Sequence, residues 1–131
     1  MAITFSEATL ALLDGRNYAV LATLNGDGSP QTSAMWVGRD GTDLVFSTVE
    51  GRLKHRNIAR DPRVSVTVHD ALDPENYVEL RGRASIEPDT ELRVGHLLAR
   101  KYDGREHAAP GPGEVRVVLR VAVDKVTGYA A

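Results

Sequence analysis

Apolar and polar residues alternate along three segments of the chain. In the last of these segments every second residue is apolar: Val115, Val117, Leu119, Val121 and Val123. In a second segment Val64, Val66 and Val68 alternate with Ser65 and Thr67. In a third, the residues on one face are Val78, Leu80, Gly82, Ala84 and Ile86. Because side chains of a strand point alternately to opposite faces, each segment predicts a strand with one buried side. Residues 126–129 are expected to extend the last strand past a bend.

Turn residues separate three more β-prone segments near the start of the chain, 17–24, 31–37 and 44–49. The first turn, Asn-Gly-Asp-Gly at 25–28, contains two glycines that tolerate positive φ. The second is Asp-Gly-Thr-Asp at 40–43. Two hairpins in succession indicate an antiparallel meander.

Short helices are predicted where the alternation stops. Ser6 is a good N-cap and Gly15 a good stop for a helix over 6–14. A second helix is expected over 52–60, and a third begins near 88–90. In the third, apolar residues recur at helical spacing: Val94, Leu98 and Tyr102.

The expected elements amount to about six or seven strands and two or three short helices. Residues 103–113, with three glycines and two prolines, are predicted to form a loop. No repeat or linker divides the 131 residues, so we expect a single domain over 1–131. A barrel hides the edges of that many antiparallel strands. The sequence therefore predicts a mainly β (α+β) fold built on an antiparallel barrel.

Composition narrows the classes of function. The net charge of −2 argues against nucleic-acid binding through bulk charge. There is no cysteine, which excludes disulfides and thiolate metal sites, and the four histidines lack ligand spacing, so no metal is predicted. The longest apolar run, 18–22, is too short to span a bilayer, and no signal peptide pattern opens the chain. We expect a cytoplasmic protein without a membrane partner.

A basic segment, residues 52–63, stands out against this background. It carries five of the 16 lysines and arginines and a single acid, whereas the rest of the chain has 11 basic and 17 acidic residues. Arg52 and Lys54 fall at the expected start of a helix, where positive charge is unfavourable unless an anion lies among the cations. Free N–H groups and two cations are suited to a phosphate. The alternative interpretation is a solvated basic helix face, and a nucleic-acid contact is the weaker third one.

Several motifs resemble a known family. They are residues 44–48 (Leu-Val-Phe-Ser-Thr), 51–57 (Gly-Arg-x-Lys-x-Arg-Asn) and 60–63 (Arg-Asp-Pro-Arg), supported by 19–24, 27–31, 77–82 and 116–121. Together they resemble the pyridoxamine 5'-phosphate oxidase-like split β-barrel proteins, the FMN-binding split-barrel type. The resemblance is greatest to the F420-dependent branch, the flavin/deazaflavin oxidoreductases of the B group, and covers roughly residues 5–128.

The resemblance implies a homodimer that binds its cofactor in a groove between the subunits. The cofactor phosphate would contact Arg52 and Lys54, the two cations of the basic motif, which also contains Asn57. The tricyclic ring would lie along two strands, beside Phe46, Ser47, Thr48, Gln31, Ser33 and Met35. Asn57 and Tyr77 are further implied cofactor-binding residues, and the partner subunit would contribute an aromatic residue near Tyr77. Trp36 is left open as a wall of the substrate pocket, a core residue or an interface residue.

The implied activity is hydride transfer from a reduced F420-type deazaflavin coenzyme to a conjugated, electron-poor organic substrate, quinone-like or tetrapyrrole-like. FMN is the alternative cofactor, since it carries the same phosphate and a similar ring. A non-catalytic protein that carries F420 or FMN is the alternative from a different functional class. In an enzyme with either F420 or FMN, the cofactor provides the redox chemistry, and the protein provides binding, orientation and electrostatics.

Overall fold

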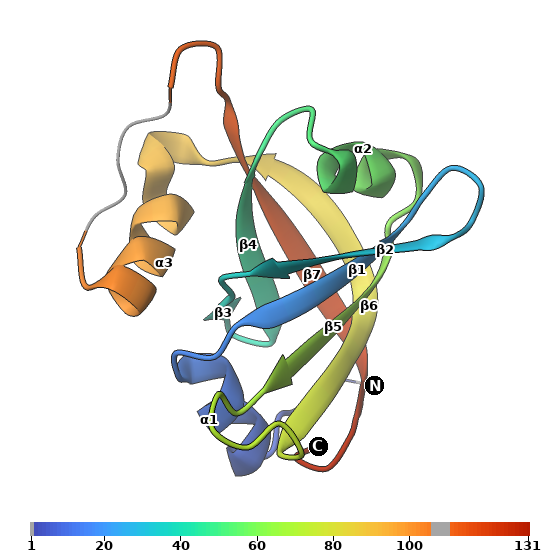
Figure 1. Ribbon diagram of the computed structural model, residues 1–131, viewed down its shortest axis with the longest axis vertical. Helices are drawn as coiled ribbons and strands as arrows, with labels where there is room; N and C mark the ends of the chain where they lie inside the picture. Colours follow the sequence, from blue (N-terminus) through green and yellow to red (C-terminus); the bar gives the residue numbers. More distant parts are fainter. Residues whose placement is uncertain (1, 106–110) are drawn as a thin grey trace.

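The computed structural model describes residues 2–105 and 111–131, and its centre is one seven-stranded antiparallel sheet. The elements follow in the order α1 Glu7–Asp14, β1 Ala19–Leu24, β2 Pro30–Met35, β3 Gly38–Asp40, β4 Asp43–Val49, α2 Leu53–Arg60, β5 Arg63–His69, β6 Tyr77–Pro88, the 3₁₀ turn η1 Thr90–Leu92, α3 Arg93–Asp103 and β7 Arg116–Thr127. The strand order is β2-β1-β5-β6-β7-β4-β3. Figure 1 shows the sheet curling into a barrel, as predicted.

The meander predicted for the first strands is wrong. The expected strand over 31–37 ends at Met35, and β2 and the next strand, β3, lie at opposite ends of the strand order. The hairpins β1–β2 and β3–β4 do form, but β4 pairs along its whole length with the distant β7. Because β3 and β7 occupy the two sides of β4, no side of β4 is left for β2.

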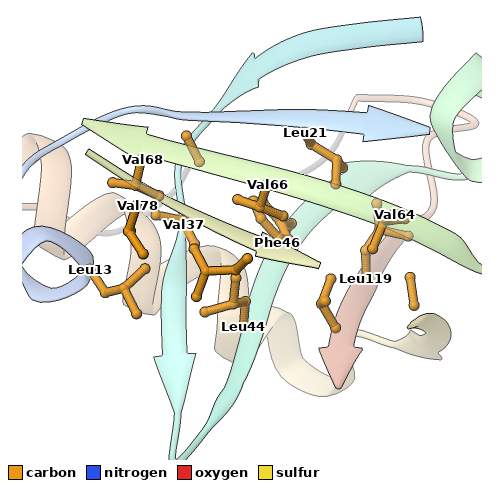
Figure 2. Packing of buried hydrophobic residues seen from close by; sticks show 14 of the residues in the cluster. Leu13, Leu21, Val37, Leu44, Phe46, Val64, Val66, Val68, Val78 and Leu119 are labelled. Atoms are coloured by element: carbon orange, nitrogen blue, oxygen red, sulfur yellow. The ribbon is translucent and has the colours of Figure 1, made fainter. Parts of the chain in front are cut away.

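The barrel interior is filled by the apolar face that the alternation predicted. Figure 2 shows side chains from β1, β4, β5, β6 and β7 pointing into one cluster, joined by Leu13 of α1. The fully buried members include Leu21, Leu44, Phe46, Val66, Val68, Val78, Leu80, Leu119 and Val121. Burial of this apolar surface is the main driving force for the fold.

The helix α1 joins the two ends of the chain. The Ser6 hydroxyl accepts a hydrogen bond from the Thr9 N–H, so the predicted cap is present. The hydroxyls of Ser6 and Thr9 also donate to the carbonyl oxygen of Ala130, at 3.0 Å and 2.7 Å respectively. The N-terminal helix is thereby fixed to the C-terminal end of the barrel.

The helix α3 begins later than predicted and after an unusual turn. Glu91 and Leu92 both have positive φ, 57° and 55°, a conformation that costs a residue with a side chain about 1–2 kcal/mol. The Asp89 carboxylate accepts from the N–H groups of Val94 and Gly95, both at 2.9 Å, and so caps α3 across this turn. Part of the loop predicted over 103–113 lies outside the described residues.

The break between β2 and β3 is bridged by side chains of α3. The Val37 N–H donates to the Tyr102 hydroxyl at 3.2 Å, and the Val37 carbonyl accepts from Lys101 Nζ at 2.7 Å. Side chains of α3 therefore satisfy both backbone groups of Val37, where a strand neighbour would ordinarily do so.

The two longest strands, β6 and β7, shift register near the bend that the sequence predicted. Arg81 lies opposite Lys125 while Gly82 lies opposite Val123, so Asp124 is the extra residue of a β-bulge. A Cβ at Gly82 would lie 2.1 Å from the Ala122 carbonyl oxygen, which explains the glycine. None of the described helices combines the length and hydrophobicity needed to cross a membrane.

Candidate functional site

A cavity of about 300 Å³ lies between the sheet and the helices α2 and α3. Its volume is at the lower end of the range for small-molecule sites. The residues that line it come from five elements and the segments beside them: Tyr18, Ala34, Met35, Trp36, Ser47, Thr48, Arg52, Lys54, Gly95, Leu98 and Arg116. By side-chain type they include a cationic group and a group of aromatic and apolar residues.

The cationic group consists of Arg52, Lys54 and Arg116, and among the described residues no carboxylate lines the cavity with them. Within the described part of the chain, these three side chains form no ion pair and no hydrogen bond. The pKa of Lys54 is lowered, first by burial and then by repulsion from Arg52. Three like charges without a counterion favour binding of an anion.

Local backbone geometry explains why these cations lie together. After β4 the chain turns at Gly51, whose φ of 94° suits only glycine well, and Arg52 takes the N-cap position of α2. Arg52 makes no side-chain capping bond, and no acid occupies the first turn. The N-terminus of α2 therefore presents unsatisfied N–H groups beside two cations, an arrangement suited to phosphate.

Two buried polar atoms of the cavity wall reinforce this interpretation. Ser47 Oγ and Arg116 Nε are both buried, and neither has a hydrogen-bond partner among residues 2–105 and 111–131. A buried donor without a partner costs about 1–3 kcal/mol. An anionic or carbonyl-bearing ligand in the cavity would satisfy both atoms, so the residues fit a phosphorylated, ring-bearing cofactor.

The structure brings five of the ten predicted site residues to this cavity: Met35, Ser47, Thr48, Arg52 and Lys54. It does not bring Phe46 there, because that side chain is fully buried in the core, as Figure 2 shows. Ser33 Oγ is buried without a partner in the described chain, but Ser33 does not line the cavity. Tyr77 begins β6, is 39% exposed and also lies outside the lining.

Gln31 and Asn57 are engaged in internal hydrogen bonds. Asn57 is only 1% exposed, and its amide donates at 3.0 Å to both Thr23 Oγ1 and Asn25 Oδ1. Its carbonyl oxygen accepts from Arg60. Gln31 Oε1 accepts from the Thr23 hydroxyl at 2.8 Å. Asn57 therefore attaches α2 to the β1–β2 hairpin, and neither it nor Gln31 lines the cavity.

Arg116 was not predicted as a site residue. It opens β7 and lies opposite Val49, at the end of β4 from which the chain enters the α2 turn. Only the pairing of strands nearly 70 residues apart places it beside Arg52, so no local pattern could identify it. No group of three or more histidine or acidic side chains in the described residues is arranged to hold a metal ion.

The comparisons with known proteins agree with this geometry. The family model described as pyridoxamine 5'-phosphate oxidase matches residues 5–130. A solved structure described as an F420 reductase is 33% identical, with 97% of this chain and 98% of that chain covered and a TM-score of 0.82. General Stress Protein 26 from Bacillus anthracis is 24% identical, with 92% and 89% covered and a TM-score of 0.72, which supports the fold.

Among curated proteins, the F420H(2)-dependent biliverdin reductase of Mycobacterium tuberculosis (strain CDC 1551 / Oshkosh) is 29% identical over 126 residues. That match covers 95% of this chain and 88% of the relative. The resemblance indicated by the sequence motifs and the split-barrel fold are thereby confirmed. The chain belongs to the pyridoxamine 5'-phosphate oxidase family.

Proposed function

We propose that this protein is an F420-dependent oxidoreductase that reduces a conjugated, electron-poor organic substrate, quinone-like or tetrapyrrole-like. Two relatives support the cofactor and the reaction class, since one is described as an F420 reductase and the other as an F420H(2)-dependent biliverdin reductase. When bound, the coenzyme supplies the hydride. This chain supplies the binding site and the electrostatic environment.

The observation that carries the proposal is the cationic group of the cavity, which has no acidic partner in the described part of the chain. Arg52 and Lys54, with the N-terminus of α2, would hold the phosphate of the coenzyme. Ser47 Oγ and Arg116 Nε are the buried donors that a ligand must satisfy, and they would fix its position on the outer face of the β4–β7 ladder. Met35 and Thr48 complete the wall beside the ring.

Coenzyme titration tests this assignment. We expect F420 to bind, and each of Arg52→Ala and Lys54→Ala to weaken binding roughly tenfold or more, since a charged hydrogen bond contributes about 1.5–3 kcal/mol. Arg56→Ala is the matched control, because Arg56 is an exposed cation of the same helix that does not line the cavity. Unchanged affinity in the Arg52/Lys54 double variant would remove the assignment.

FMN is the competing coenzyme, because its phosphate suits the same cations. Parallel titrations with F420 and FMN distinguish the two, and we expect tighter binding of F420. Reduced F420 with a series of quinones and tetrapyrroles then tests catalysis. Tight binding without oxidation of the reduced coenzyme above background would favour a carrier over an enzyme.

We also propose a homodimer with the cofactor at the subunit interface. A groove at β1, β2 and β5 supports a subunit contact: it is lined by Ala22, Leu24, Pro30, Arg63 and Ser65 and reaches down to the core residue Val64, and Tyr77 is an exposed aromatic residue on β6. Such surfaces mark interaction sites in soluble proteins. Sedimentation velocity at micromolar concentration should show a dimer, and a monomer throughout would refute it.

A further inference from the structure

Three aromatic side chains form a stack, and two of them line the cavity. Tyr102 of α3 lies between Tyr18 and Trp36, with ring centroids 5.8 Å from Tyr18 and 5.2 Å from Trp36. The interplanar angles are 24° and 3°, so both pairs are stacked. Three of the seven aromatic residues of the chain therefore gather here, including its only tryptophan.

The central ring is held in place by polar groups at its rim. The Tyr102 hydroxyl donates to the Asn17 carbonyl at 2.6 Å and accepts from the Val37 N–H at 3.2 Å. The ammonium of Lys101 lies 4.9 Å from the ring centroid and itself donates to the carbonyls of Leu13 and Val37. Tyr102 is thus a spacer with fixed orientation that positions the two outer rings.

The outer rings belong to the cavity. Tyr18 and Trp36 both line it, next to the apolar side chains of Ala34, Met35 and Leu98, whereas Tyr102 does not. Tyr18 is 60% exposed. A tyrosine left exposed on a rigid aromatic support, at the mouth of an apolar pocket, offers a flat surface on which a planar ligand can stack.

We propose that Tyr18 and Trp36, positioned by Tyr102, form the surface that selects a planar conjugated acceptor for reduction. The inference rests on the proposed function and refines it, because it assigns the cationic group of the cavity to the coenzyme and the aromatic group to the substrate. It also resolves the alternatives for Trp36 in favour of a substrate-pocket wall. The planarity and ring area of the substrate then govern its selection, and Tyr18 and Trp36 require no charge on it.

The sole tryptophan provides a direct readout of binding in the coenzyme-free protein. Menadione, an uncharged planar quinone, should quench Trp36 emission in a saturable way. Tyr18→Leu should weaken that binding about fivefold, within the range of measured aromatic pair contributions. Tyr129→Leu is the matched control, since Tyr129 is 80% exposed and does not line the cavity. Circular dichroism of each variant checks that the fold is retained.

Steady-state kinetics with reduced F420 separates substrate selection from coenzyme binding. We expect Trp36→Leu and Tyr18→Leu to raise KM for menadione about fivefold while the dissociation constant of F420 stays the same. Loss of F420 affinity in these variants would show that the stack holds the coenzyme, and this would overturn the inference but not the proposed function. An unchanged KM for menadione in both variants would overturn it as well. If wild-type protein binds no F420, the proposed function fails, while the quenching experiment still tests the stack.

Discussion

Ser47 and Arg116 are diagonal neighbours on one face of the β4–β7 ladder, and each directs a buried polar atom without a partner toward the cavity. Each atom lowers the stability of the fold, because it is buried from water and has no hydrogen-bond partner among the described residues. A site that sacrifices stability in this way is typical of a surface prepared for a ligand.

Replacement of Arg116 should affect stability and binding in opposite directions. In Arg116→Met, the buried Nε without a partner is gone, so the midpoint of urea unfolding should stay equal or rise. Affinity for F420 should fall about tenfold or more, as expected for a lost charged hydrogen bond. Arg16→Met, at an exposed arginine outside the cavity, is the control. Wild-type affinity in Arg116→Met would show that this guanidinium faces no ligand.

Removal of the Asn57 amide should destabilise the fold. Three hydrogen bonds, with Thr23, Asn25 and Arg60, would be lost in Asn57→Ala, which should lower the free energy of unfolding by about 2–4 kcal/mol. Urea denaturation measures the change. A loss below about 0.5 kcal/mol would contradict the role of Asn57 in attaching α2 to the hairpin.

The pH dependence of the free energy of unfolding should show the lowered pKa of Lys101. Burial lowers its pKa to about 8 in the folded protein, from an ordinary value of 10.5. Between these two pH values the unfolded chain binds more protons than the folded one, so this group makes the free energy of unfolding rise with pH from about 8 to 10.5.

The comparison of Lys101→Met with wild type isolates that contribution. The variant should lose the rise, and its stability profile between pH 8 and pH 10 should be flatter. Lys125→Met is the control, because Lys125 is an exposed lysine of β7. Parallel profiles for Lys101→Met and wild type would show that the ammonium is not desolvated.

A side chain at Gly82 should disrupt the β6–β7 bulge. The Cβ of Gly82→Ala would meet the Ala122 carbonyl oxygen at 2.1 Å, a backbone contact that cannot relax without moving a strand. We expect a loss of about 3 kcal/mol, the upper part of the range for overpacking. Gly26→Ala, where the nearest atom is 3.7 Å away, should change stability little. Equal midpoints for the two variants would contradict this account of the bulge.

Local pattern predicted most of the barrel and two cavity residues, Arg52 and Lys54, whereas Met35, Ser47 and Thr48 came from the family resemblance. Alternation located the strands because one face of each is buried, and the capping hydroxyl of Ser6 marked the first helix. Arg52 and Lys54 could be identified from the sequence because positive charge is unfavourable at the N-terminus of a helix. Phe46 was assigned to the cofactor by resemblance, although its position two residues after Leu44 already places it on the buried face.

What the sequence could not provide depends on distant contacts. The separation of β2 from β3 depends on the pairing of β4 with β7, and Arg116 enters the site through the same pairing. The stack of Tyr18, Trp36 and Tyr102 joins three segments that only the folded chain brings together. Nothing in residues 89–93 indicates two successive residues of positive φ, because neither Glu91 nor Leu92 favours that conformation.

The side chains of Lys101 and Tyr102 that bind the backbone of Val37 also hinder strand pairing with other molecules. A strand interrupted between β2 and β3 would leave a peptide group free to recruit a strand from another molecule. Because Tyr102 occupies the N–H and Lys101 the carbonyl, no foreign backbone can pair there. The discontinuity in this sheet is thus closed to intermolecular β-sheet growth, the first step of aggregation.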